Sequence, residues 1–171
     1  MTDNISLIQG NLFGTEMETI VITVNCVGIM GKGIALELKN HAKPAYENYR
    51  ELCDAGKMNL GKSVIYDKPL DELNGKTILF FPTKFHWRNQ SNLFEIKKGL
   101  EHFAENYADM GITSIAFPAL GCSNGGLNWN DVKPVMCEYL EDLDIEIKIY
   151  SPVKQTEKKS NPKPSKITDY Q

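Results

Sequence analysis

Apolar residues in this chain form short runs that alternate with longer segments of helical periodicity. Six runs predict strands, at residues 5–9, 20–24, 63–66, 77–81, 114–117 and 146–150. Four periodic segments predict helices, at about residues 34–41, 46–53, 92–111 and 130–143. Most of the strands are apolar throughout, which is typical of a sheet covered on both faces. We therefore expect an α/β fold, a three-layer α/β/α sandwich around a mixed, mostly parallel sheet.

The alternating pattern stops after Pro152. Residues 1–152 are long enough to form one domain with a buried core. Residues 153–171 contain five lysines, two acidic residues and almost no apolar side chains. Such a composition cannot offset the entropy lost on ordering, so we expect a basic, flexible C-terminal tail.

The formal net charge of −3 conceals an asymmetry, because residues 1–152 contain 14 basic and 20 acidic side chains. A body this acidic is a poor general binder of a nucleic-acid backbone, so any polyanion would bind at a local site. No apolar run approaches the roughly 20 residues of a membrane helix, and we expect no membrane partner. The four cysteines lack metal-ligand or disulfide spacing, which favours the reducing cytoplasm and predicts no metal or cofactor.

The segment from Val24 to Leu38 passes from a strand through three glycines into a helix. Glycines let backbone N–H groups approach a ligand closely, and the helix N-terminus favours an anion, so this segment predicts a phosphate cradle. Its spacing is neither the dinucleotide fingerprint nor a P-loop. A tight turn that only connects strand and helix is the alternative that this pattern leaves open.

Ligands of open α/β sheets bind beyond the carboxyl ends of the strands. Three loops are expected there, at residues 25–33, 83–90 and 121–126. Two are rich in glycine, and the middle loop contains Lys84, His86 and Arg88. Two loops lined by backbone and one cationic loop suit an extended phosphorylated ligand.

Four motifs in order carry a family resemblance: GNLF from Gly10, VNCVGIMGKGIALEL from Val24, FPTKFHW from Phe81 and PALGCSNGGLNW from Pro118. Together they resemble a macrodomain of the DarG branch, the antitoxins that remove ADP-ribose from DNA, and the related terminal ADP-ribose glycohydrolase of animals. The resemblance implies an enzyme that binds ADP-ribose and releases it from nucleobases of single-stranded DNA without a metal or cofactor. It also implies a DarT-type toxin as partner. DarG proteins bind that toxin through a further C-terminal domain, and a short basic tail leads us to expect this second function to be absent, truncated or supplied elsewhere.

The resemblance also implies the ligand-binding residues. They are Asn11, Leu12, Asn25, Gly31, Lys32, Gly33, Ile34, Thr83, Gly121, Cys122, Ser123, Asn124, Gly125, Gly126 and Tyr150. Asn11 would accept a hydrogen bond from adenine, Tyr150 would stack on it, and the two glycine loops would hold the pyrophosphate. Asn25 would face the distal ribose. Asn11 serving only a turn and Tyr150 serving only the core are the alternatives.

By the same resemblance, Lys84 is the catalytic nucleophile that attacks the anomeric carbon of the distal ribose. An amine attacks only when neutral, so burial or a neighbouring cation such as Arg88 must lower its pKa. His86 is a candidate for handling the proton, with an exposed histidine as the alternative. Trp87 and Arg88 are expected to contact the base through stacking and charge.

One position departs from the animal enzyme, which has an aspartate where this chain has Gly125. No acidic residue lies between Gly121 and Asn130, so the group that assists Lys84 is unassigned. Three further functions stay open: a reader that binds ADP-ribose without turnover, a hydrolase of ADP-ribose 1″-phosphate, and a hydrolase of protein-linked ADP-ribose.

Overall fold

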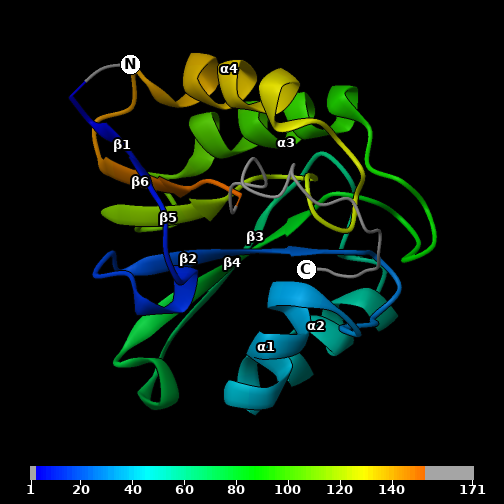
Figure 1. Cartoon of the computed structure of the whole chain (residues 1–171). Helices are drawn as coiled ribbons and strands as arrows, with labels where there is room; N and C mark the ends of the chain where they lie inside the picture. Colours follow the sequence, from blue (N-terminus) through cyan, green and yellow to red (C-terminus); the bar gives the residue numbers. More distant parts are fainter. Residues whose placement is uncertain (1–2, 153–171) are drawn as a thin grey trace, which may run out of the picture.

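The computed structural model describes residues 3–152, which form one six-stranded sheet flanked by helices (Figure 1). The strands are β1 (Ile5–Ile8), β2 (Thr19–Val24), β3 (Val64–Leu70), β4 (Lys76–Pro82), β5 (Ser114–Pro118) and β6 (Glu146–Tyr150). The helices are α1 (Gly33–His41), α2 (Lys43–Asp54), α3 (Leu93–Asn106) and α4 (Trp129–Leu140), with 3-10 turns η1 (Leu12–Gly14) and η2 (Asp71–Leu73). The predicted tail at 153–171 lies outside the described residues.

The sheet has the strand order β1-β6-β5-β2-β4-β3. All neighbours pair in parallel except β3, which pairs antiparallel with β4. The mixed, mostly parallel sheet expected from the sequence is thereby confirmed. Since five strands run the same way, their ends meet at one side of the sheet, called here the carboxyl edge, and their beginnings meet at the opposite amino edge.

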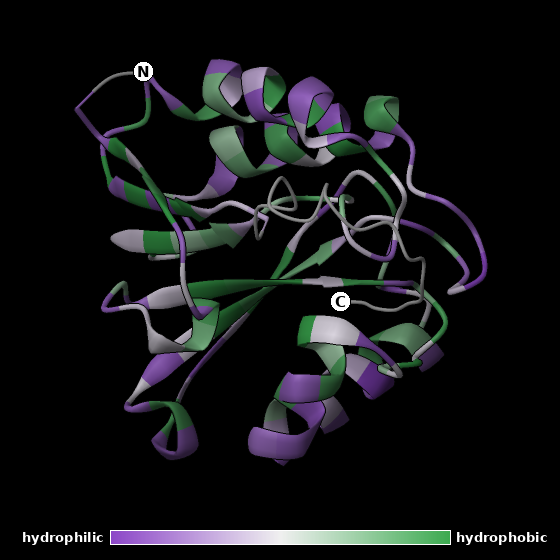
Figure 2. Ribbon diagram, in the orientation of Figure 1, coloured by the Kyte–Doolittle hydropathy of each residue, from purple (hydrophilic) through white to green (hydrophobic). Residues whose placement is uncertain are grey.

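Helices cover both faces of the sheet, with α3 and α4 on one and α1 and α2 on the other (Figure 1). The core divides accordingly, because successive strand residues point to opposite faces. In β4, Leu79 and Phe81 pack with the residues of α3 and α4, whereas Ile78 and Phe80 pack with those of α1 and α2. The central strands are correspondingly apolar, and the helices carry hydrophilic stripes (Figure 2). The three-layer sandwich is confirmed.

Helix α3 lies very close to β4 at one point. A Cβ at Gly99 would come within 2.6 Å of the Phe81 ring, so only glycine allows this approach. Within residues 3–152, no helix combines the length and the apolar character needed to cross a bilayer.

Several element ends differ from the sequence expectation. Helix α2 begins at Lys43 rather than at residue 46, and α3 ends at Asn106 rather than at Gly111, because residues 107–111 form turns. Strand β3 continues beyond Tyr66 through an exposed polar stretch, with a register shift against β4, because it is the edge strand and its outer residues face solvent. Helix α4 ends at Leu140 rather than Leu143. The N–H of Leu143 instead donates a hydrogen bond to the Leu140 carbonyl in a turn, and the Leu143 side chain still packs against the core.

Candidate functional site

A cavity of about 1070 Å³ opens at the carboxyl edge of the sheet. It is lined by residues that follow the parallel strands: Gly10 and Asn11 after β1, Asn25 after β2, Lys84 after β4, Gly121 after β5 and Ser151 after β6. The antiparallel strand β3 contributes no lining residue in the described part of the chain. The topology therefore explains why segments distant in sequence meet at this cavity.

The first glycine loop, residues 25–33, is shaped by the buried side chain of Asn25. Its Oδ1 accepts hydrogen bonds from the N–H groups of Val27 (3.0 Å) and Ile29 (3.3 Å), and its Nδ2 donates to the Ile29 carbonyl (2.7 Å). The buried Tyr49 hydroxyl of α2 lies 2.8 Å from both Asn25 Oδ1 and the Asn25 carbonyl. Burial raises the pKa of Tyr49, which keeps this hydroxyl as a donor. Asn25 lines the cavity, and its observed bonds hold its own loop, so contact with a ribose stays a prediction.

Lys84 lies just after β4, where main-chain hydrogen bonds continue the pairing of β2 and β4 beyond the ends of the strands. Beyond the last paired residues of β2 and β4, Thr83 N–H donates to the Val24 carbonyl (3.0 Å) and Cys26 N–H donates to the Phe85 carbonyl (2.8 Å). These bonds fix the main chain on either side of Lys84. Its side chain is half-buried at the cavity wall, and Nζ donates to the Asn124 carbonyl at 3.1 Å.

Burial lowers the pKa of the Lys84 amine, and the nearby positive charge of Lys32 lowers it further. The direction agrees with the sequence expectation, but the suggested cation was wrong. Arg88 places its guanidinium 4.8 Å from the Trp87 ring centre, and it is not among the groups that shift the pKa of Lys84. Lys32 belongs to the first glycine loop. This loop therefore lines the cavity and also carries the positive charge that lowers the pKa of Lys84.

The second glycine loop, residues 121–126, contacts both the lysine and the first loop. Its Asn124 carbonyl accepts the bond from Lys84, and the Asn124 side-chain nitrogen lies 2.9 Å from where a Cβ of Gly33 would be. The loop closes on itself through Leu127 N–H, which donates to the Gly121 carbonyl at 2.9 Å. It rests on Ser91, whose N–H donates to the Gly125 carbonyl at 2.9 Å.

The two residues expected at adenine, Asn11 and Tyr150, both line the cavity. Asn11 also caps the N-terminus of η1, where its Oδ1 accepts a hydrogen bond from Phe13 N–H at 3.0 Å. Tyr150 also packs against the core cluster on the α1 and α2 side. Each alternative from the sequence is thus observed, and each residue remains placed to contact a ligand.

The other expected ligand-binding residues are brought together at the cavity, with one exception. Lining residues include Leu12, Gly31, Lys32, Gly33, Ile34, Thr83, Cys122, Ser123, Asn124 and Gly125. Gly126 does not line it. Burial raises the pKa of the Cys122 thiol to about 11, so this side chain stays protonated and is no candidate nucleophile at neutral pH.

His86 lies outside the cavity lining. Its Nδ1 accepts a hydrogen bond from Arg88 N–H at 3.1 Å, and its ring lies 5.3 Å from the Trp87 ring. These contacts shape the loop after Lys84 and direct one nitrogen to the backbone. A proton-handling role for His86 stays a prediction that the geometry does not favour.

A model of the Macro domain family matches residues 21–136, more than half of the chain. The chain belongs to the macrodomain family. Its match spans the first glycine loop, Lys84 and the second glycine loop, which are the parts of the site described above.

Among relatives, a DNA ADP-ribosyl transferase–DNA ADP-ribosyl glycohydrolase fusion protein of Thermosipho africanus is 39% identical over 91% of this chain and 44% of its own length. A DNA ADP-ribosyl glycohydrolase of Mycobacterium tuberculosis is 40% identical over 84% of this chain and 41% of its own. This macrodomain thus spans less than half the length of these relatives. The solved macrodomain of Mycobacterium tuberculosis DarG superposes with a TM-score of 0.81 at 39% identity, covering 86% of this chain and 97% of that one.

Several lining residues of this macrodomain were not expected from the sequence: Gly10, Thr23, Val24, Ile29, Ala35, Pro118, Ala119, Ser151 and Pro152. Most of them immediately flank a strand end or an expected ligand residue. The sheet topology would have indicated most of them, because residues at and just after the end of a parallel strand lie at the carboxyl edge.

Proposed function

We propose that this macrodomain is an ADP-ribosyl glycohydrolase that releases ADP-ribose from modified nucleobases in single-stranded DNA. Its bacterial relatives at 39–40% identity are named DNA ADP-ribosyl glycohydrolases. The Thermosipho africanus DarTG protein, solved in complex with ADP-ribose, superposes with a TM-score of 0.85 at 39% identity, covering 89% of this chain and 42% of that one. These likenesses support both the ligand and the reaction class.

The observation that carries the proposal is the environment of Lys84. Its amine lines the cavity between the two glycine loops, and its pKa is lowered by burial and by Lys32. A depressed pKa makes an amine available as a nucleophile, whereas a lysine that only bound phosphate would gain from keeping its charge. The position of Lys84 between the two glycine loops, together with the direction of its pKa shift, supports a nucleophilic role for this residue.

The cavity suits ADP-ribose because it has an aromatic residue, Tyr150, at one end and the cationic Lys84 at the other, with the two glycine loops between them. Tyr150 and Asn11 lie at the strand ends of β6 and β1, next to each other in the sheet, and would hold adenine. The glycine loops would bind the pyrophosphate through N–H groups, aided by the N-terminus of α1. The distal ribose would then lie toward Lys84.

In the proposed reaction, the neutral amine of Lys84 attacks the anomeric carbon of the distal ribose. A bond forms between Nζ and that carbon, and the bond to the base nitrogen breaks with its electron pair leaving to the base, which takes up a proton. Water later displaces the lysine and restores the free amine. Since Gly125 supplies no carboxylate, the group that transfers these protons is left unassigned.

We assign contact with the modified base and its strand to Trp87 and Arg88. Trp87 lines the cavity with 43% of its surface exposed, and the guanidinium of Arg88 lies over its ring. Exposed aromatic rings stack on unpaired bases, and a stacked arginine adds charge for a phosphate. Loops 25–33, 83–90 and 121–126 contain no acidic residue, which favours an anionic strand locally despite the acidic body.

We further propose an antidote role in the cytoplasm against a DarT-type DNA ADP-ribosyltransferase. The fusion of transferase and glycohydrolase in the Thermosipho africanus relative supports this pairing. Removal of the modification is sufficient for such a role and requires no contact between the two proteins.

The test is incubation of an ADP-ribosylated single-stranded oligonucleotide with the wild-type protein and with Lys84→Ala. Wild type should release ADP-ribose, and Lys84→Ala should be slower by about 10³-fold or more while still binding ADP-ribose by calorimetry. Equal melting temperatures of the two proteins would show that the loss is chemical rather than structural.

Other outcomes would redirect the assignment. Negligible release by both proteins, with tight ADP-ribose binding, would identify a reader. Release from ADP-ribosylated protein but not from DNA would identify a protein de-modifying enzyme, and phosphate release from ADP-ribose 1″-phosphate would identify a phosphohydrolase. Absence of any ADP-ribose binding by the wild type would contradict the proposal entirely.

A further inference from the structure

Ser91 holds a buried hydroxyl that lacks a partner. It is 8% exposed, and its Oγ is the buried side-chain polar atom within residues 3–152 that makes no hydrogen bond. An unpaired buried hydroxyl loses its hydration without compensation, so native proteins rarely keep one without a reason. The question is what this hydroxyl serves.

Ser91 lies directly behind the second glycine loop. Its Oγ occupies the space that a Cβ of Gly125 would need, 2.2 Å from that position, and lies 3.4 Å from the position of a Cβ at Gly121. Its own N–H donates to the Gly125 carbonyl at 2.9 Å. The hydroxyl therefore lies against the loop at Gly121 and Gly125, and Ser91 itself is not among the residues that line the cavity.

The same segment reaches the catalytic lysine, because Asn124, next to Gly125, accepts the bond from Lys84 Nζ. A small shift of the loop at Gly125 would therefore move both a wall of the cavity and the acceptor of the amine. No such connection exists for the other buried serine, Ser63, which pairs with His102 Nδ1 through its N–H (3.3 Å) and hydroxyl (3.4 Å).

We propose that Ser91 is a positioning residue whose hydroxyl bonds to a peptide group of the 121–126 loop when that loop closes on ADP-ribose. This inference rests on ADP-ribose being the ligand of the cavity. The free protein bears the cost of the unpaired hydroxyl, and the bound protein gains the hydrogen bond. Because the interaction differs between the two states, it contributes to affinity rather than to the stability of the free fold.

The proposal predicts an unusual separation of stability and affinity in Ser91→Ala. This variant keeps the backbone bond to Gly125 and removes only the hydroxyl. Its melting temperature without ligand should be equal to or higher than that of wild type, since an unpaired polar group is lost. Its affinity for ADP-ribose, measured by calorimetry, should fall by about 3- to 10-fold, the range of one hydrogen bond.

Ser63→Ala is the matched control, because it removes an equally buried serine hydroxyl that has a partner. It should lower the melting temperature and leave the affinity for ADP-ribose unchanged. Ser91→Ala and Ser63→Ala should therefore show opposite patterns.

Equal affinity of wild type and Ser91→Ala would overturn the proposal while leaving the proposed function intact. A fall in affinity together with a lower melting temperature would also overturn it, since Ser91 would then only support packing. If the wild type bound no ADP-ribose, the proposed function and this inference would both fail.

Discussion

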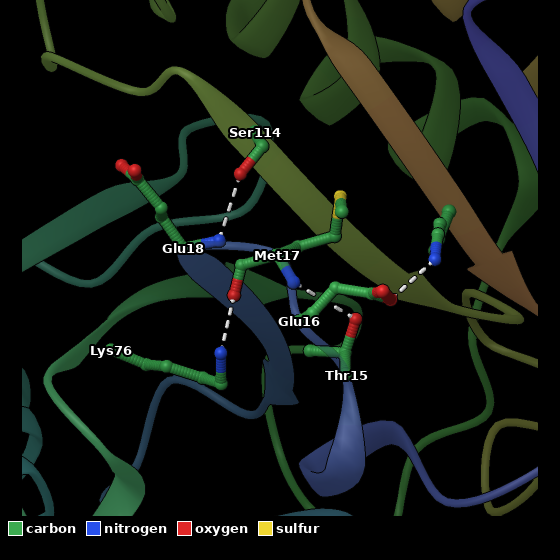
Figure 3. A network of polar contacts seen from close by, with 7 residues as sticks. Thr15, Glu16, Met17, Glu18, Lys76 and Ser114 are labelled. Carbon is green, nitrogen blue, oxygen red and sulfur yellow. Dashed lines mark hydrogen bonds and ion pairs between the residues drawn. The ribbon is translucent and has the colours of Figure 1, made fainter.

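At the amino edge of the sheet, side chains at the starts of β4 and β5 form hydrogen bonds with main-chain groups of the segment before β2 (Figure 3). Lys76 Nζ donates to the Met17 carbonyl at 2.8 Å, and Glu18 N–H donates to Ser114 Oγ at 2.8 Å. At the carboxyl edge, by contrast, the loops surround a cavity, and the unpaired Ser91 hydroxyl is found there. The amino edge is thus closed by hydrogen bonds between its own segments, whereas the hydrogen bonds of the carboxyl edge hold loops around an open cavity.

This division follows from the parallel topology. Because the five parallel strands end on the same side, the amide-rich loops and the α1 N-terminus collect at one edge. The amino edge has no such role and can be covered by its own side chains, as the paired hydroxyls of Thr19 and Thr77 (2.8 Å apart) illustrate. Variants at the two edges should therefore affect different measurements.

The largest effect beyond loss of Lys84 is expected for Gly125→Ala at the carboxyl edge. The new Cβ would lie 2.2 Å from Ser91 Oγ and 2.6 Å from the Gly121 carbonyl oxygen, and the backbone oxygen cannot yield cheaply. Displacement of the loop should lower ADP-ribose affinity by roughly 10-fold or more, measured by calorimetry. Gly14→Ala is the control, because no atom lies within 4 Å of its Cβ position and Gly14 does not line the cavity. Unchanged binding by Gly125→Ala would contradict the role of this loop.

Lys32→Gln should give the next largest effect. Loss of its charge removes one of the two causes that lower the pKa of Lys84, so that pKa should rise. Because only the neutral amine reacts, turnover increases with pH through the pKa of Lys84, and this rise should move to higher pH. At pH 7 the fall in kcat should be a few-fold, under about 10-fold, and it should recover at alkaline pH.

Arg88→Gln serves as the control for Lys32→Gln, because Arg88 does not contribute to the shift at Lys84. It should leave the pH at which kcat rises unchanged, even if KM for the oligonucleotide increases. A parallel shift in both variants would show that the electrostatic cause has been assigned to the wrong residue.

At the amino edge, Lys76→Met should lower stability without affecting the ligand. The bond to the Met17 carbonyl is partly buried, so its loss should cost about 1 kcal/mol in the free energy of unfolding. Denaturant unfolding would measure this, and ADP-ribose affinity should equal that of wild type. A change in affinity would show that the two edges are coupled.

Glu16→Gln should have the smallest effect, because its ion pair with Lys148 (2.6 Å) lies at the surface. The Lys148 hydrogen bond and charge lower the pKa of Glu16 below its usual 4.5. A lowered pKa gives a stabilisation that is present above pH 4.5 and disappears as the pH falls through the folded-state value. The difference in melting temperature between wild type and Glu16→Gln should therefore be slight at neutral pH, shrink in acid and shrink in high salt.

Much of the fold could be predicted from the sequence, because burial on both faces leaves unmistakable apolar runs such as residues 20–24 and 77–81. The end of β3 could not, since its outer residues Asp67 to Pro69 face solvent and carry no apolar signal. The end of α4 was predicted too late, at Leu143. This residue has helical spacing and packs on the core, but it lies in a turn after the helix.

For the site, the resemblance of the motifs to the family predicted most of the residues that line the cavity. It could not predict which way their side chains point. Arg88 is close to Lys84 in the sequence and Lys32 is far from it, and only the structure shows that Lys32 is the cation that lowers the pKa of Lys84. Ser91 looks like an ordinary loop serine in the sequence. Its position behind Gly125 depends on contacts between segments more than 30 residues apart, which no local pattern records.

The hydrogen bonds that continue from β2 and β4 into the following loops have one more consequence. Main-chain atoms of Val24, Cys26, Thr83 and Phe85 hold Lys84 in place, so its anchoring does not depend on the identities of the neighbouring side chains. Phe85, Trp87 and Arg88 can therefore be exchanged for other residues without moving Lys84. With Lys84 as the proposed nucleophile, such an arrangement would let the preference for what is attached to the sugar diverge, in nature or by engineering, while the proposed bond-breaking step is retained.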